Sequence, residues 1–224
     1  MLRDESNKAI EPVIANPKNA GLLIIGFKAW AAPQPPEGAL QAREPLSTRR
    51  SRAVWDLQRG RVALTVSEYS SLREALTGLG VELEYNQLLE VPRGPEDLGE
   101  ISFVHPREAP PAAFFVRGNL LLAVHSFGRE SVDVLPFARQ LDADLQSRPS
   151  EARDGGIDLD VDDRGFRAVP KWRGADGYLK VFAPGAELYL EGDAVRVSAG
   201  PEEVVVYSLE PGRETYVALA KRKP

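Results

Sequence analysis

The residues of this sequence that are best suited to catalysis are His125 and Ser126, which follow a run of apolar residues. A serine nucleophile needs a base within hydrogen-bond reach and an acid that orients the base, and Asp133 lies a few residues further on. Adjacent residues of a strand point to opposite faces of a sheet, so we expect His125 and Ser126 to lie apart. The sequence also lacks the G-x-S-x-G motif of a nucleophile elbow. A hydrolase site assembled around His125 is therefore the alternative hypothesis.

A second group with possible chemistry consists of Asp158, Asp160 and Asp162, which alternate with apolar residues. This alternation predicts a strand with three carboxylates on one face, and carboxylate oxygens are ligands that calcium prefers. The spacing is not that of an EF-hand loop, because Asp163 and Val169 stand where that loop needs glycine and glutamate. The other interpretation is a charged sheet edge that discourages pairing with another strand. Calcium is the only cofactor that the sequence suggests.

Four aromatic residues, Trp55, Trp172, Tyr178 and Tyr189, could form a platform that binds sugar or peptide, and Trp172 and Tyr178 are the preferred candidates. Trp172 lies between Lys171 and Arg173 in a predicted loop, where we expect its ring to be exposed. Tyr178 begins a predicted strand shortly afterwards. Packing in the core is the competing role for such rings.

The composition excludes several classes of protein. The chain has 224 residues, of which 43% are apolar and 27% charged, which is typical of a folded protein. It has no cysteine, so disulfides, thiolate zinc sites, iron–sulfur clusters and a cysteine nucleophile are excluded. Two histidines leave little room for a histidine-rich metal site.

The charge and hydropathy of the chain argue against nucleic acid and membrane as partners. The formal charge is -5, and a protein that binds nucleic acid usually carries an excess of basic residues. The basic residues Arg43, Arg49, Arg50 and Arg52 cluster locally, and we interpret them as part of a solvated linker. No apolar run approaches the roughly 20 residues of a membrane-spanning helix.

The compartment stays open at this stage. The apolar run at residues 21–27 follows an acidic start, whereas a signal peptide begins with basic residues, so we expect a buried strand at 21–30. The lack of cysteine is compatible with either compartment. A periplasmic or extracellular location is favoured if a leader was removed, and a cytoplasmic location otherwise.

Residues 1–85 predict an arm with a linker, one hairpin, one helix and one strand. Proline-rich residues 31–52 suggest a linker, so 1–52 is interpreted as an N-terminal arm with a linker. Residues 53–68 predict a hairpin that turns at Arg59 and Gly60. Ser71 and Glu74 form a capping box that starts a helix over 72–79, and the alternation at 81–85 then predicts a strand.

The strongest local signals lie between residues 113 and 145. Gly118 and Asn119 separate two apolar runs and predict a tight hairpin, whose continuous hydrophobicity suggests that both faces are covered. A single apolar stripe predicts a helix over 134–145, with Asp133 as its N-cap. We expect Asp142 and Asp144 to face water on this helix.

The sequence of the last third of the chain predicts β-structure. Residues 147–156 predict a linker, and beyond it seven apolar runs alternate with turn signals every eight to twelve residues. This spacing is typical of a sandwich or a barrel.

Two stretches resemble known groups of proteins. Residues 204–216 resemble the end of a fibronectin type III or bacterial immunoglobulin-like module, in which Leu209 and Pro211 precede a corner tyrosine, here Tyr216. Residues 114–145 resemble a hairpin–helix unit of uncharacterised bacterial exported proteins. These resemblances imply a β-sandwich and a non-catalytic protein of the cell envelope.

Taken together, the sequence predicts an α+β fold. We expect an antiparallel sheet with two helices on one face in residues 53–148, followed by a small all-β sandwich or barrel in residues 155–224. The predicted function is non-catalytic binding, adhesion or structural support, with a protein or glycan as partner and with no nucleic acid and no membrane span.

Overall fold

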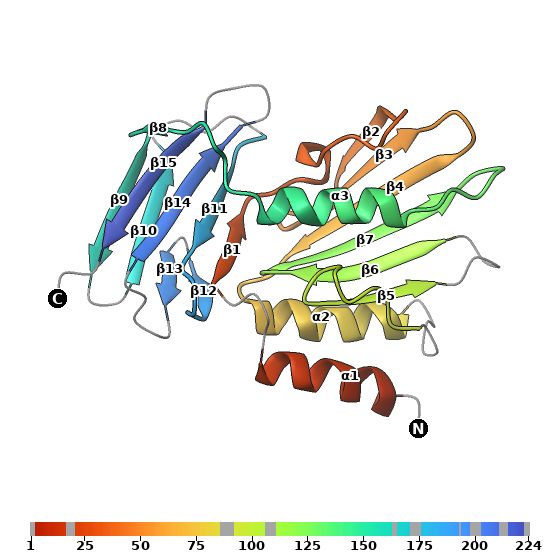
Figure 1. Ribbon diagram of the computed structural model, residues 1–224, viewed down its shortest axis with the longest axis horizontal. Helices are drawn as coiled ribbons and strands as arrows, with labels where there is room; N and C mark the ends of the chain where they lie inside the picture. The colour runs from red at the N-terminus through yellow and green to blue at the C-terminus, as the bar shows by residue number, and fades with distance from the viewer. Residues whose placement is uncertain are drawn as a thin grey trace.

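Three sheets and three α-helices occupy the described part of the chain, which comprises several ranges. The computed structural model describes residues 3–16, 21–85, 92–105, 111–162, 165–170, 176–192, 194–197, 203–210 and 215–221. Strands hold 46% of the described residues and none of the sheets that they form is closed, so the fold is α+β with a predominance of strands (Figure 1).

The largest sheet has six strands, and each strand runs antiparallel to its neighbours. Both predicted hairpins are present, because the third strand of the chain pairs with the fourth and the sixth with the seventh. In sheet order the strands are β2 (Ala39–Pro45), β3 (Arg50–Asp56), β4 (Arg61–Glu68), β7 (Leu120–Phe127), β6 (Ala112–Arg117) and β5 (Ile101–His105).

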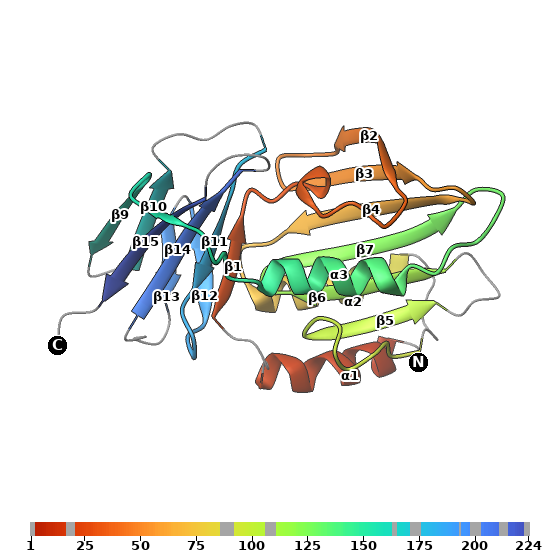
Figure 2. The ribbon, with the colours of Figure 1, turned by 45° about the horizontal axis from the view of Figure 1, so that its top comes forward.

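Helices cover both faces of this sheet, so the prediction of two helices on one face is wrong. Helix α2 (Leu72–Tyr85) packs on one face, with α1 (Arg3–Ala15) beside it, and α3 (Leu135–Gln146) packs on the other (Figure 2). The physical reason lies in β6, where Phe114 belongs to the core under α2 and Phe115 to the core under α3. A strand that is apolar at every position needs a cover on each side.

Helix α2 is longer than the sequence predicts. The capping box forms in part, because the Ser71 hydroxyl accepts the Glu74 N–H at 3.2 Å. The helix then continues through the predicted strand at 81–85, because Leu83 extends the stripe that it buries against the sheet. Gly78 does not end the helix: a Cβ there would lie 2.2 Å from the Tyr69 hydroxyl oxygen, so the glycine permits close packing.

The other two sheets form an open sandwich rather than a barrel. Alternate residues of the two sheets, such as Val181 and Val195, meet in a shared core. One sheet has the order β12 (Leu188–Glu191), β13 (Ala194–Val197), β10 (Gly165–Pro170), β9 (Ile157–Asp162). The other has the order β1 (Leu22–Ile25), β11 (Tyr178–Phe182), β14 (Glu203–Leu209), β15 (Tyr216–Lys221), β8 (Arg153–Asp154).

The N-terminal segment is not an arm followed by a linker. Strand β1 pairs with β11 at an edge of the sandwich, and β2 pairs with β3 in the six-stranded sheet. The short 3-10 helix η1 (Ala29–Ala31) lies between them, against β3. The first 45 residues therefore contribute one strand to each unit, since a buried apolar strand such as β1 needs a partner.

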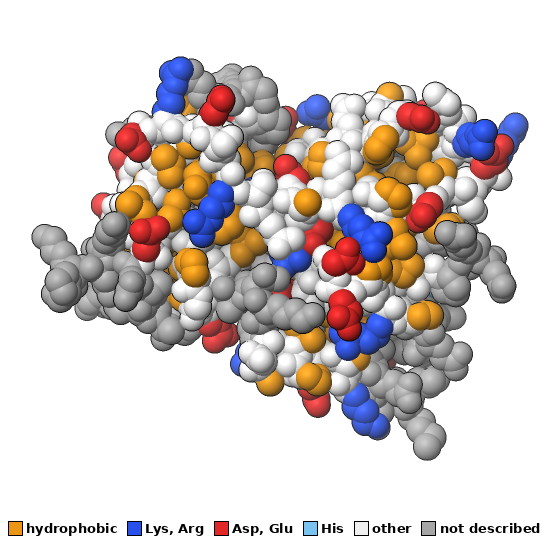
Figure 3. Space-filling view, in the orientation of Figure 1, with side chains coloured by type: hydrophobic (Ala, Val, Ile, Leu, Met, Phe, Trp, Pro, Cys, Tyr) orange, Lys and Arg blue, Asp and Glu red, His pale blue; other side chains and the backbone are white. Residues whose placement is uncertain are grey.

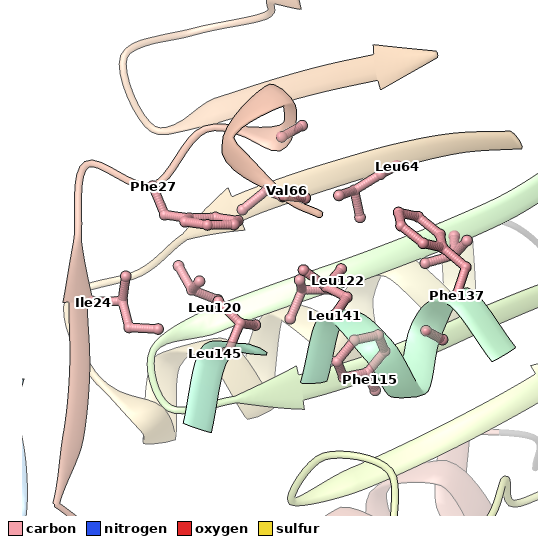
Figure 4. Packing of buried hydrophobic residues seen from close by; sticks show 14 of the residues in the cluster. Ile24, Phe27, Leu64, Val66, Phe115, Leu120, Leu122, Phe137, Leu141 and Leu145 are labelled. Carbon is pink, nitrogen blue, oxygen red and sulfur yellow. The ribbon is translucent and has the colours of Figure 1, made fainter. Parts of the chain in front are cut away.

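One continuous core joins the two units on the α3 side of the large sheet. Phe137, Leu141 and Leu145 of α3 lie over Phe115 and Leu122 (Figure 4). The same cluster continues through Ile24, Phe27, Tyr178 and Phe182 into the sandwich. Helix α3 therefore bridges the units: its N-terminal end lies over the far part of the sheet and its C-terminal end beside the sandwich (Figure 1).

Candidate functional site

His125 and Ser126 lie on opposite faces of β7, as expected, and do not form a catalytic pair. The Ser126 hydroxyl is buried on the α3 side, where it accepts the Val132 N–H at 2.8 Å. The His125 ring packs edge-to-face on Phe114 on the α2 side, with 5.1 Å between centroids. Burial lowers the pKa of His125, Arg52 lowers it further, and Glu82 opposes both. Within the described residues, neither ring nitrogen of His125 has a hydrogen-bond partner that could make it a catalytic base.

The predicted calcium ligands do not gather into a metal site in the described part of the chain. Asp158 and Asp160 are exposed on β9, which is an edge strand of its sheet. The side chain of Asp162 lies outside the described residues. Among the side chains that the structure describes, no group of three or more acidic or histidine residues is arranged to hold a metal. The position of β9 agrees with the interpretation of a charged edge.

The predicted aromatic platform does not form around Tyr178. Its ring is buried and packs edge-to-face on Phe27, with 5.0 Å between centroids. Burial raises the pKa of the Tyr178 hydroxyl, and Asp144 adds to this shift. Tyr178 is therefore a core residue between the two units, and Trp172 lies outside the described residues.

The predicted basic linker is part of the β2–β3 hairpin, and three of its four arginines form ion pairs. Arg50 pairs with Glu82 at 3.3 Å and Arg52 with Glu44 at 3.8 Å. Arg43 pairs with Asp176 of the sandwich at 3.3 Å. These three side chains therefore connect neighbouring elements of the fold.

A cleft of about 400 Å³ lies at the N-terminal end of α3. Seven of its twelve lining residues are apolar: Pro35, Pro36, Leu57, Val62, Val132, Pro136 and Phe137. A second hollow of about 380 Å³ lies on the other side of the segment 131–133 and shares it as a wall. Figure 3 shows hydrophobic side chains on this face both above and below the N-terminal end of α3. Together the hollows form the candidate site.

Local sequence features hold the segment between the two hollows in place. The Asp133 carboxylate accepts the Leu135 N–H at 3.0 Å, and Pro136 fits the first turn of α3 because it needs no N–H there. The Ser126 hydroxyl of β7 accepts the Val132 N–H and so holds this segment against the sheet. Gly60 in the β3–β4 turn permits the approach from the side: a Cβ there would lie 2.6 Å from the Glu130 carbonyl oxygen. The segment between the two hollows is therefore held by contacts with α3, with β7 and with the β3–β4 turn.

A strained turn forms one lip of the cleft. The Gly38 N–H donates to the Pro35 carbonyl at 2.9 Å and closes a four-residue turn. Glu37 occupies its third position with a φ of 64°, and it is the sole non-glycine residue of the described ranges with a positive φ. Glycine or asparagine is favoured at such a position. Strain of this kind clusters at ligand-binding sites, so the location of Glu37 points to the cleft independently of its shape.

The indole N–H of Trp55 is a buried polar group next to the wall of the cleft, and it has no partner among the described residues. The indole of Trp55 is 1% exposed, and its Nε1–H has no hydrogen-bond acceptor among the described residues. The ring contacts Phe137, with 5.3 Å between centroids, and Trp55 pairs across the sheet with Val62. Phe137 and Val62 both line the cleft. A buried N–H that lacks an acceptor is uncommon because it has lost its bond to water.

The other end of α3 holds polar groups that are fully paired. Asp142 is 2% exposed, so the expectation that it faces water is wrong. Its carboxylate accepts two hydrogen bonds from Arg117, at 2.7 and 2.8 Å, and Arg117 also donates to Glu100 at 3.0 Å. The Lys180 ammonium reaches the Asp144 carbonyl at 2.5 Å at the end of the helix. This network is structural, since each of these side chains has its partners.

The β6–β7 turn adds a contact that its sequence signal did not reveal. Asn119, predicted as a turn residue, is completely buried. Its side-chain amide accepts the Ile24 N–H at 2.7 Å and donates to the Ile24 carbonyl at 2.9 Å, so it pairs with β1 as a strand would. The turn thus ties the large sheet to the sandwich.

Sequence reasoning did not locate the candidate cleft, although it included Trp55 among the aromatic residues that could bind a ligand. The prolines at 35 and 36 indicate a linker by their composition, and Asp133 indicates only a helix cap. The one available signal was Glu37, which stands between Pro36 and Gly38 at a place where a turn favours glycine or asparagine. The cleft itself joins three segments that are far apart in the chain, so no local pattern could reveal it.

Comparisons with known proteins give no further guidance. No family model matches the chain, and neither a curated protein nor a solved structure gives a match. None of the described helices has the length and apolar character that a membrane crossing requires.

Proposed function

We propose that this protein is a non-catalytic recognition protein of the bacterial cell envelope that binds a protein partner through the cleft at the N-terminal end of α3. The observation that carries the proposal is the coincidence of an apolar cleft with the strained turn at Glu37. Apolar clefts with a few polar groups at the rim are the usual form of a binding site. The sites predicted for catalysis and calcium do not assemble in the described residues, which favours binding.

The lining of the cleft favours a protein over a glycan as the ligand. A sugar ring presents hydroxyl groups, and each of them needs a hydrogen-bond partner when it is buried. The walls of the cleft offer mainly proline, valine, leucine and phenylalanine side chains, while the charged residues Glu37, Arg59 and Asp133 are exposed at its rim. Such a surface fits apolar side chains of a polypeptide.

The sandwich supports the resemblance to an immunoglobulin-like module. Its strands β9, β10, β13 and β12 form one sheet, and β11, β14 and β15 are consecutive in the other. Labelled A to G in chain order, these are sheets A-B-E-D and C-F-G, the order of the constant-type immunoglobulin fold. Strand β1 is added beside strand C. We propose on this basis that the second unit is an immunoglobulin-like module, a type of fold common in extracellular recognition.

Selection of peptides tests the proposed function. A phage-displayed library of random peptides is selected on the full chain, and an oligosaccharide array is probed in parallel. We expect enrichment of apolar peptides and binding of no oligosaccharide. Synthetic copies of the enriched peptides should bind Val132→Arg at least about tenfold more weakly, because the arginine fills the shared wall of both hollows with charge.

The matched control is Val81→Arg, which places the same charge at an apolar residue of α2 that is 62% exposed and does not line the cleft. This variant should bind the peptides as the wild type does. Failure to enrich any peptide, binding that is indifferent to Val132→Arg, or selective binding of an oligosaccharide would each overturn the proposal.

A further inference from the structure

The unpaired indole N–H of Trp55 indicates what the ligand of the cleft must offer. We infer that the cleft takes an extended, apolar polypeptide segment, one backbone carbonyl of which accepts a hydrogen bond from Trp55 Nε1. This inference rests on the proposed function and adds the conformation and the chemistry of the bound segment.

Two residues that line the cleft are direct neighbours of Trp55. Phe137 contacts the Trp55 ring, with 5.3 Å between the ring centroids, and also lines the cleft. Val62, the cross-strand partner of Trp55, lines the same cleft. Since Trp55 does not itself line the cleft, the inferred hydrogen bond requires Phe137 or Val62 to move aside.

The missing acceptor distinguishes between classes of ligand. An extended or polyproline segment has no internal hydrogen bonds, so its carbonyls are free to accept. A helical segment uses its carbonyls internally, except at its last turn. Recognition of extended proline-rich segments by grooves with aromatic walls is a common mode of peptide binding. An extended segment thus offers apolar side chains to the walls of the cleft. It also offers a free carbonyl that can accept the Trp55 indole N–H.

Nuclear magnetic resonance on the full chain can test this inference directly. The probe is a blocked hexapeptide of alternating leucine and proline, together with any peptide enriched in the selection above. Methyl resonances of Leu57 and Val132 report on occupation of the cleft, and the indole ¹H–¹⁵N resonance of Trp55 reports on the hydrogen bond. Trp30, whose indole already donates to Asp176, is an internal reference.

We expect the methyl resonances of the cleft to shift and the Trp55 indole proton to move downfield, while that of Trp30 stays in place. In Trp55→Phe, which removes the donor but keeps a ring, affinity for the peptide should fall up to about tenfold. The indole readout uses the wild type, so the test does not depend on the folding of this variant.

The outcomes separate the inference from the proposed function. If the methyl groups shift while the Trp55 indole and the affinity of Trp55→Phe stay unchanged, the inference is overturned and the cleft remains a binding site. If neither the methyl groups nor the indole respond to any enriched peptide, the proposed function fails as well.

Discussion

The two ends of helix α3 differ in how completely their polar groups are paired. At the C-terminal end, Arg117 holds Asp142 and Glu100 in a buried triad, and Lys180 reaches the last carbonyls of the helix. At the N-terminal end, the Trp55 indole has no acceptor among the residues that the structure describes, and Glu37 has a strained backbone. Both ends rest on the same sheet and belong to the same hydrophobic cluster.

This difference shows where the protein is built for rigidity and where it is available for recognition. The triad fixes α3 to the large sheet, and Lys180 of β11 ties the helix to the sandwich. Breaking any one of these pairs leaves a costly unpaired group. Unpaired groups and strain persist only where a ligand compensates for them or where the surrounding structure enforces them. The two ends of one helix thus serve different purposes, and substitutions at each end can test the difference.

The largest expected effect is at the paired end, in the variant Arg117→Met. Removal of the guanidinium leaves two carboxylates buried together, so we expect the free energy of unfolding to fall by about 3–5 kcal/mol. Urea unfolding followed by circular dichroism measures the loss. Arg139→Met on α3 is the matched control: its partner Asp97 is exposed, so this substitution should cost about 0–1 kcal/mol.

The triad can also be replaced as a unit. Arg117→Met combined with Glu100→Leu and Asp142→Leu leaves no buried charge, and most of the lost stability should return. Equal stability of the single variants at positions 117 and 139 would contradict the view that the C-terminal end depends on its buried pairs.

A smaller effect should appear in the dependence of stability on pH at Lys180. Burial lowers the pKa of its ammonium from 10.5, and Asp144 opposes the shift. Between the lowered pKa and 10.5 the folded protein therefore binds fewer protons than the unfolded chain, so this residue makes the free energy of unfolding rise with pH. The rise is about 1.4 kcal/mol for each unit by which the pKa is lowered.

Lys180→Met removes this contribution and isolates it from that of the neighbouring Tyr178. The raised pKa of Tyr178 makes the free energy of unfolding fall as the pH rises, because its hydroxyl keeps its proton longer in the folded state. Wild type and variant share this contribution. Between neutral pH and pH 10.5, the free energy of unfolding of the wild type should therefore rise relative to that of Lys180→Met. A difference that is constant across this range would show that Lys180 is solvated like a surface lysine.

Local patterns in the sequence predicted most of the elements but not their arrangement. Turn residues and apolar periodicity located both hairpins, the sandwich strands and α3, because these features depend on neighbours in the chain. The alternation at 81–85 was misleading, since Leu83 also fits the helical stripe of α2. The placement of α2 and α3 on opposite faces depends on which side of β6 each helix covers, and no local pattern specifies that.

The candidate site was less predictable than the fold for the same reason. Its walls come from residues 35–37, from the β3–β4 turn and from the start of α3, which meet only after the sheet has formed. Asp142 and Asn119 show the same limit at the other end of the helix. Each has the sequence signature of an exposed position, and each is buried by a partner that lies many residues away.

The smallest expected effect is at the strained lip of the cleft, in the variant Glu37→Gly. Glycine adopts the positive φ of this position without a steric penalty, so we expect the free energy of unfolding to rise by about 1 kcal/mol. Glu130→Gly is the matched control: this exposed glutamate has no positive φ, so the added flexibility of the unfolded chain should lower stability by about 0.5–1 kcal/mol. A gain in stability for Glu37→Gly together with a loss for Glu130→Gly would show that the backbone at Glu37 is strained. Equal losses would mean that the turn is relaxed, and Glu37 would then no longer distinguish the cleft from an ordinary surface hollow.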